Sequence, residues 1–426
     1  MSEDDALLEA FDAAVAAGDR CAMATVVSVE GSSYRRPGAR MLVREDGSCT
    51  GTVSAGCLEA DVAEHAKRAM RTGAATLAEY DTSASSEELA WGMGLGCNGV
   101  VRVLVEPLSR GSLYMDTLRR TRGSPSEAAV TMATFYRHSE HAASPAPARV
   151  GTGARIAIDE RGAVRHEGMS GDTVGVLASL VRAMVRAGTK ADSHVGNVDG
   201  SAIGVLVETL QPPVPLLVFG AGADAVPVVQ RAAELGWRTE VADPQARTAS
   251  RSRFAMADRV TLARPEDVGV HVRVTPRTMA VVMTHDYAQD LALLGFLLAS
   301  PARYIGVLGP RHRTERMLRE LAATLPPPCL APASLARLHA PAGLDIGANG
   351  PVEIALSIVA EMRAALDGRS GGSLRERHGA IHDRAGETTG TALAHGPMHG
   401  VAADQAAIAG AAGIEAWSEV RCASGL

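Results

Sequence analysis

A glycine-rich turn between an apolar strand and a helical segment constrains the fold of this chain most. The apolar run at residues 215–219 leads into Gly220-Ala-Gly-Ala-Asp-Ala225, and a helical pattern follows. This order matches the G-x-G-x-x-G/A turn of Rossmann folds, whose glycines allow a tight turn and a close approach of phosphate to the helix N-terminus. Asp243 ends the next strand, where an acid binds the ribose hydroxyl in NAD-binding folds. The cofactor-binding candidates of this turn are Gly220, Gly222, Ala225 and Asp243.

Strand and helix patterns alternate from Val214 onwards, which predicts a doubly wound parallel sheet. Two further strand ends carry polar side chains, in Thr284-His-Asp286 and in Gly309-Pro-Arg-His-Arg313. Ligands of open α/β sheets bind at these carboxyl ends. His285, Arg311 and Arg313 are therefore candidates, and the arginines suit a phosphate or a pterin-type anion. The alternatives are a loop histidine and a solvated helix start, and the charge of Asp224 would oppose an anion at the first turn.

The first half of the chain contains two similar segments. The stretch EAAVTMATFYR resembles RCAMATVVSVE, GTGARIAIDERGAV resembles RPGARMLVREDGSC, and SAIGVLVETL resembles GVVRVLVEPL. These three pairs and one helical segment in each copy make four matched elements in the same order. They indicate a divergent duplication of one α+β module rather than a long repeat array. The helical TVGVLASLVRAMVRAG is expected to replace the first helix, at residues 7–17.

Cys57 stands in a turn of small residues, GTVSAGCLEADV, that leads into a helical pattern. Ser54 is expected to cap this helix, and Glu59 and Asp61 fall in its first turn. A thiol at a helix start experiences the positive end of the helix dipole, which favours the thiolate that binds metals or attacks sulfur. The second copy has Asp172 in place of Cys57, so the turn forms without a thiol. A chemical role and a buried structural role both remain open for Cys57.

Composition excludes several classes of protein. The net charge of −6 argues against a nucleic-acid binder, and no apolar run reaches the length of a membrane span. The acidic N-terminus lacks the pattern of a signal peptide, which predicts a cytoplasmic protein. Six cysteines without C-x-x-C spacing indicate free thiols rather than disulfides or a zinc site.

These patterns predict an α/β protein with a duplicated N-terminal α+β module followed by a C-terminal Rossmann-like doubly wound parallel sheet. The expected parts are a module with Cys57 at residues 1–108, a linker at 109–125, the divergent second copy at 126–212, the Rossmann-like domain at 213–368 and a largely mobile extension at 369–426. A short helix is expected around residues 406–417 of that extension.

The chain resembles the XdhC/CoxI family in eight ordered motifs, which span about residues 5–382. They are GSSYRRPGARMLV, GTVSAGCLEADV, GLGCNG, VFGAGA, VADPQ, MTHD, YIGVLGPRHR and DIGANGPVEIALSIVAEM. The resemblance implies an accessory factor that binds molybdenum cofactor (molybdopterin), assists its sulfuration by a cysteine desulfurase and inserts it into a molybdenum hydroxylase apoenzyme of the xanthine dehydrogenase or carbon monoxide dehydrogenase type. Cys57 then becomes the candidate sulfur or molybdenum ligand.

Gly56 would leave room for such a ligand, and Cys97, in the second glycine-rich loop, could converge on the same site or pack in the core. NAD(P) is a second cofactor candidate, and a homodimer is a further expectation. Two other functions stay open: an NAD(P)-dependent oxidoreductase with His285 as its acid, and an NAD-binding redox or scaffold protein. A maturation factor is favoured over a turnover enzyme, because the thiol is present in one copy and absent from the other.

Overall fold

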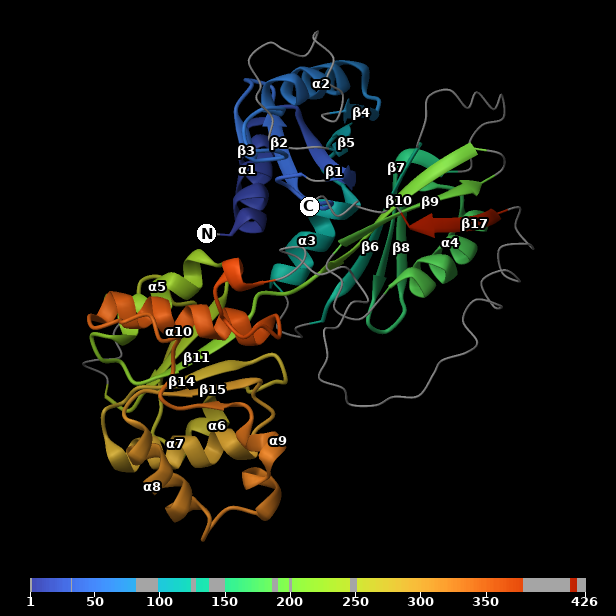
Figure 1. Cartoon of the computed structure of the whole chain (residues 1–426). Helices are drawn as coiled ribbons and strands as arrows, with labels where there is room; N and C mark the ends of the chain where they lie inside the picture. The colour runs from blue at the N-terminus through green and yellow to red at the C-terminus, as the bar shows by residue number, and fades with distance from the viewer. Residues whose placement is uncertain are drawn as a thin grey trace. The chain divides into compact units, whose positions relative to one another are not determined.

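The computed structural model describes residues 2–31, 33–81, 99–123, 128–137, 150–185, 191–198, 201–245, 251–377 and 414–419 (Figure 1). The chain divides into two compact units. One unit spans Glu3–Pro212 and includes strand β17 (Ile414–Glu419), and the other spans Pro213–Gly379. Each unit has its own sheets and its own core.

The first unit contains two antiparallel sheets with the same topology. The first sheet has the spatial order β3 (Cys49–Gly51), β2 (Arg40–Arg44), β1 (Cys21–Gly31), β5 (Gly99–Pro107) and β4 (Thr76–Asp81). The second has the order β8 (Val164–Met169), β7 (Val150–Asp159), β6 (Val130–Arg137), β10 (Ser201–Leu210) and β9 (Ala191–Val198), with β17 paired outside β9. Each strand of one sheet has a counterpart at the same place in the other, which confirms the predicted duplication.

The helices of this unit show which segments correspond. They are α1 (Glu3–Ala17), α2 (Glu59–Thr72), α3 (Leu113–Gly123) and α4 (Gly171–Met184). Helix α2 ends at Gly73, which adopts the left-handed conformation that caps many helices. Both α2 and α4 follow the third strand of their sheet, so α4 is the counterpart of α2. The expectation that it replaces the first helix is wrong, because α3 precedes the second sheet as α1 precedes the first.

The segment expected as a linker, residues 109–125, therefore contains a helix of the core. Helix α3 buries Leu113, Tyr114, Met115 and Leu118. These side chains pack with Leu7 and other buried residues of the unit. Arg119 and Arg120 are exposed, so the sequence of this segment looks polar. Only one face of the helix is polar, however, and the opposite face is apolar and buried.

Two buried ion pairs connect the modules reciprocally. Arg40 on β2 of the first module pairs with Glu208 on β10 of the second, and Nη1 of Arg40 lies 3.0 Å from Oε2 of Glu208. Arg155 on β7, the counterpart of β2, pairs with Glu106 on β5, the counterpart of β10. All four side chains are buried, with exposed fractions of 5–7%. Reciprocal contacts of this kind are those of a two-fold interface.

Electrostatics explain why these charges are tolerated in the interior. Burial alone lowers the pKa of both Arg40 and Arg155, but the partner carboxylates raise it by more, so each pKa lies above its ordinary value. Each arginine also donates to a backbone carbonyl, of Gly38 at 2.9 Å and of Gly153 at 3.2 Å. The charges are therefore both paired and hydrogen-bonded, as buried charges must be.

Strand β1 is buried on both faces because it lies between a helix and the other module. Ala22, Ala24 and Val26 pack in the core under α2. On the other face, Val27 packs with Tyr136 and Leu206 of the second module. This explains why Cys21–Val29 is buried throughout and mostly apolar, although most antiparallel strands alternate apolar and polar residues.

The second unit is a six-stranded parallel sheet. Its spatial order is β13 (Arg259–Leu262), β12 (Arg238–Asp243), β11 (Pro215–Phe219), β14 (Met279–Val282), β15 (Tyr304–Val307) and β16 (Leu338–His339). Numbered along the chain, this is the order 3-2-1-4-5-6 of dinucleotide-binding Rossmann folds. The predicted doubly wound sheet is confirmed, and its order reverses between β11 and β14.

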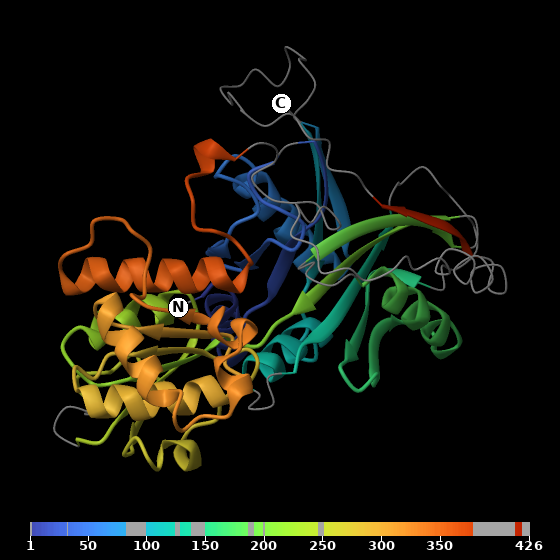
Figure 2. The ribbon, with the colours of Figure 1, turned by 60° about the horizontal axis from the view of Figure 1, so that its bottom comes forward.

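Helices cover both faces of this sheet, as Figures 1 and 2 show. Helices α5 (Ala225–Glu234) and α10 (Pro351–Leu366) pack on one face around Val228 and Ile358. Helices α7 (Tyr287–Ala299) and α8 (Arg311–Leu321) pack on the other around Leu294 and Met317. The short helices are α6 (Val268–His271), α9 (Pro332–Leu335) and the 3-10 turns Pro327–Leu330 and Leu374–Glu376.

The C-terminal extension differs from the expectation where it is described. Ile414–Glu419 forms strand β17, which pairs antiparallel with β9. The helix expected around residues 406–417 is therefore wrong at residues 414–417. The remainder of that segment, and most of the extension that was expected to be mobile, lies outside the described residues.

The reciprocal ion pairs lead to a stability prediction. Arg40→Met should lower the free energy of unfolding by about 3–5 kcal/mol, because it leaves the buried carboxylate of Glu208 without its partner. The double variant Arg40→Met with Glu208→Leu should recover most of this loss, because it removes both charges. Urea denaturation of the full chain measures both effects.

Arg20→Met is the matched control, because Arg20 pairs with Glu45 at the solvent-exposed surface. This control should leave the denaturation midpoint unchanged. An equal loss of stability for Arg40→Met and Arg20→Met would contradict the structural role of the buried pair.

Candidate functional site

The glycine turn joins β11 to α5 at the point where the strand order reverses. Gly220 has φ +105°, and a Cβ atom there would lie 2.6 Å from the carbonyl oxygen of Met283. Only glycine therefore allows the turn to pack against the end of β14. The turn places Gly222 and the first residue of α5, Ala225, at the carboxyl edge of the sheet, as predicted.

The side chain of Asp243, at the end of β12, stabilises the backbone of this turn. Its Oδ2 accepts a hydrogen bond from the Ala221 N–H at 2.8 Å, and its Oδ1 accepts one from the Gln245 N–H at 2.7 Å. The acid predicted to bind ribose thus also holds the glycine turn in place.

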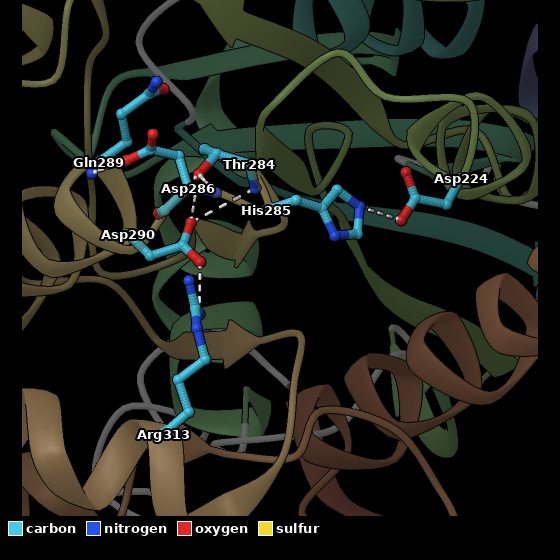
Figure 3. Close-up of polar contacts among 7 residues, drawn as sticks. All are labelled: Asp224, Thr284, His285, Asp286, Gln289, Asp290 and Arg313. Carbon is cyan, nitrogen blue, oxygen red and sulfur yellow. Dashed lines mark hydrogen bonds and ion pairs between the residues drawn. The ribbon is translucent and has the colours of Figure 1, made fainter.

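His285 lies across the turn from Asp224. Nε2 of His285 is 2.7 Å from Oδ2 of Asp224, as Figure 3 shows. His285 has φ +63°, which is uncommon for a residue other than glycine and marks a strained backbone at the end of β14. Its side chain is 62% exposed, whereas that of Asp224 is 17% exposed. The pair therefore presents an imidazole, oriented by a carboxylate, at the carboxyl edge of the sheet.

A second network fixes Arg313 near the same edge (Figure 3). The carboxylate of Asp290 is 1% exposed and accepts hydrogen bonds from Thr284 Oγ1 at 2.5 Å and from Arg313 Nη1 at 2.6 Å. Because Thr284 precedes His285, the network also holds the backbone on which the histidine sits. Sequence reasoning missed Asp290, since its position inside the apolar helix α7 was the only signal that it is buried and paired.

The other arginine candidate is placed differently. Arg311 is the first residue of α8 and is exposed. Asp286, next to His285, caps α7 by accepting a hydrogen bond from the Gln289 N–H at 2.9 Å. The structure therefore joins Asp243 and His285 to the glycine turn by direct contacts, links Arg313 to Thr284 through Asp290, and leaves Arg311 at the helix surface.

Cys57 belongs to the first unit, in the turn before α2. Helix α2 begins at Glu59, so the prediction that Ser54 caps its first turn is wrong. Instead, Oγ of Ser54 accepts hydrogen bonds from the N–H groups of Gly56 and Leu58, both at 3.1 Å. Ser54 therefore stabilises the turn that carries the thiol, rather than the helix that follows.

The carboxylate of Glu59 folds back over the same turn. It accepts hydrogen bonds from the N–H groups of Ser54 at 2.8 Å, Val53 at 3.2 Å and Leu58 at 3.2 Å. Burial raises the pKa of Glu59, but the bonds from Ser54 and the backbone more than offset this, so the pKa lies below its usual value. The backbone around Cys57 is thus fixed by one charged acceptor.

Cys57 is a free, half-buried thiol at the edge of the core under α2. Gly56 has φ +109°, and a Cβ atom there would have no other atom within 4 Å. The Cβ position of Gly56, the residue before Cys57, is therefore open. Cys97, the other thiol candidate, lies outside the described residues.

Metal clusters and membrane helices are both absent from the part of the chain that the structure describes. No group of three or more His, Cys, Asp and Glu side chains is arranged there to hold a metal ion. Within the same ranges, no helix combines the length and apolar character that a membrane crossing requires.

The fold and its turn define a protein that joins a duplicated α+β unit to a Rossmann unit. Residues 216–362 match the model of the XdhC Rossmann domain, and residues 14–81 match that of the XdhC and CoxI family. A Bacillus subtilis protein described as a probable xanthine dehydrogenase subunit is 33% identical over 84% of this chain and 94% of its own length. The chain belongs to the XdhC and CoxI family, which confirms the resemblance.

Two further relatives agree with this assignment. The crystal structure of a Bacillus halodurans protein, described as a xanthine dehydrogenase, superposes with a TM-score of 0.67 at 29% identity and covers 88% of this chain and 98% of its own. The uncharacterized protein YqeB of Escherichia coli is 31% identical over 44% of this chain and 34% of its own length. The similarity to the solved structure thus extends over both units.

The Glu59 contacts lead to a pH-dependent prediction. Glu59→Gln should lower the free energy of unfolding at neutral pH by about 1 kcal/mol, a modest value because the carboxylate is partly solvated. Because the folded-state pKa of Glu59 is lowered, its contribution is present above the unfolded-state pKa of about 4.3 and is lost as the pH falls through the folded-state value. Urea titrations from about pH 7 to about pH 3 should therefore show the two proteins converging in acid.

Glu64→Gln is the control, because Glu64 lies on the same helix but pairs with Lys67 at the surface. A gap between wild type and Glu59→Gln that stays constant down to acid pH would show that the carboxylate charge does not hold the turn.

Proposed function

We propose that this protein is an accessory factor for a molybdenum hydroxylase of the xanthine dehydrogenase type. It binds molybdenum cofactor through the module that carries Cys57, assists sulfuration of the cofactor and inserts it into the apoenzyme. Family membership and the B. subtilis relative, whose description names xanthine dehydrogenase, support the accessory role. The partners would be the hydroxylase apoenzyme and a cysteine desulfurase.

The observation that carries the role of Cys57 is a half-buried free thiol on a fixed backbone, next in the chain to a glycine whose Cβ position is open. The Ser54 and Glu59 contacts hold the turn, and Gly56 leaves its outer side free. Thiolate sulfur is a soft ligand that suits metals bound by sulfur. The residues therefore fit the cofactor, which when bound would supply a molybdenum centre already ligated by sulfur.

In this proposal the side chain of Cys57 provides the sulfur atom that contacts the cofactor, and Gly56 leaves space for the cofactor to approach. The thiol either ligates the cofactor or, as thiolate, takes the outer sulfur from a persulfide of the cysteine desulfurase, whose thiol leaves, and carries that sulfur for the sulfuration. The counterpart position in the second module, Asp172, is exposed at the start of α4 and has no sulfur to offer. Only one of the two modules would then bind the cofactor.

The Rossmann unit supports a second candidate function, an NAD(P)-dependent oxidoreductase. Its strand order, the glycine turn and Asp243 support a dinucleotide site, and His285, paired with Asp224 at the carboxyl edge of the sheet, would be the acid. Oxidation of NADH by the purified protein with a small carbonyl substrate would favour this function. In the first proposal the same edge, with Arg313 held by Asp290, offers a position for a phosphate or pterin anion.

Replacement of Cys57 tests the proposal. Cys57→Ser should sharply lower the molybdopterin retained per protein purified from its own host, and lower the yield of active hydroxylase, because the sulfur is lost. Its melting temperature should stay within about 2 °C of wild type, because a half-buried thiol and a hydroxyl differ little in volume. Pterin fluorescence and thermal denaturation measure the two effects.

Cys49→Ser is the matched control, because Cys49 is an exposed free thiol of the same module. It should retain cofactor and melting temperature. If Cys57→Ser folds, retains cofactor like wild type and still matures its hydroxylase, the cysteine is structural and the proposal is wrong.

A further inference from the structure

The second glycine of the turn normally leaves space for a phosphate. In dinucleotide-binding folds this glycine lets the diphosphate approach the backbone at the start of the helix. In this chain a Cβ atom built at Gly222 would lie 2.6 Å from Oδ1 of Asp224 and 3.8 Å from Cδ2 of His285. The space that Gly222 leaves is therefore already filled by a carboxylate and the edge of an imidazole.

The negative charge of Asp224, like its volume, opposes a phosphate at the glycine turn. Asp224 precedes the first residue of α5, at the end of the helix whose free N–H groups and dipole attract anions. Its carboxylate makes no capping hydrogen bond to the helix, and it contacts His285 instead. A phosphate at the turn would thus meet a negative charge beside the N–H donors at the start of the helix.

His285 is held in position from both sides. Thr284 is bound to the buried Asp290, and Asp286 caps α7. These contacts hold the left-handed backbone of His285, from which Nε2 reaches Asp224, as Figure 3 shows. The imidazole is a fixed partner that keeps the carboxylate over the turn.

We infer that Asp224, held by His285, sets the ligand selectivity of the Rossmann crevice by excluding the diphosphate of a dinucleotide from the glycine turn. The crevice of this chain admits a ligand that carries no phosphate at this point. The inference rests on the Rossmann-type glycine turn. It argues against a dinucleotide as the ligand of the second candidate function, and it is independent of the role proposed for Cys57.

Calorimetric titration of the full chain with NAD+ tests the inference. Asp224→Asn removes the charge and keeps the volume, whereas Asp224→Ala removes both. Each variant should bind NAD+ about tenfold or more tightly than wild type, because a unit charge at contact distance from the phosphate is removed. Adenosine, which carries no phosphate, should gain no affinity from either change.

Glu234→Gln is the matched control, because Glu234 is the last residue of the same helix and lies far from the turn. It removes one negative charge and should leave NAD+ binding unchanged. Melting temperatures of all variants establish that each is folded.

The remaining outcomes distinguish the selectivity role of Asp224 from the nucleotide role of the crevice. Equal binding of NAD+ by wild type and both Asp224 variants, or an equal gain for adenosine, would overturn the selectivity role and leave the crevice a nucleotide site. No NAD+ binding by any variant would overturn the nucleotide role of the unit, and the inference with it.

Discussion

The reciprocal ion pairs between the two modules are the constraint on which the first unit depends. A buried arginine is tolerated only when a carboxylate pairs with it and further hydrogen bonds satisfy its donors. For Arg40 and Arg155 the carboxylates come from the other module, so neither module provides its own neutralisation. Arg40 also lies 4.0 Å above the ring of Tyr114, which links helix α3 to the same cluster. The two copies therefore form one cooperative body.

The two modules of this unit share one strand order, but the side chains at the start of their helices α2 and α4 differ. The turn before α2 carries Ser54, Cys57 and Glu59, and the corresponding stretch before and in α4 has Met169, Asp172 and Val174. The second copy has no thiol here, and its helix α4 already begins at Gly171, whereas α2 begins at Glu59. Because the second module forms its helix without the turn that Ser54 and Glu59 hold, the presence of that turn in one module supports the proposal that it serves the thiol.

The Rossmann unit shows which features of a site can be predicted from local sequence and which cannot. The glycine turn, Asp243 and His285 were predicted to lie at one edge, because the carboxyl ends of parallel strands meet there. The contact between Asp224 and His285 could not be predicted, since the two residues are brought together by pairing of β11 with β14 and by an uncommon backbone conformation at His285. Asp290 was hidden for a similar reason, because burial and pairing depend on what a helix packs against.

The sequence by itself determined many periodic and local features of this protein: the strands and helices of the Rossmann unit, the glycine turn, the duplication and the family. These follow from spacing and from backbone preferences that act over a few residues. Only the tertiary structure decided that residues 113–123 form a core helix, that Arg40 meets Glu208, and that the carboxylate of Asp224 fills the space above Gly222. Such contacts join residues far apart in the chain, and their free energy exists only once burial has removed the competing water.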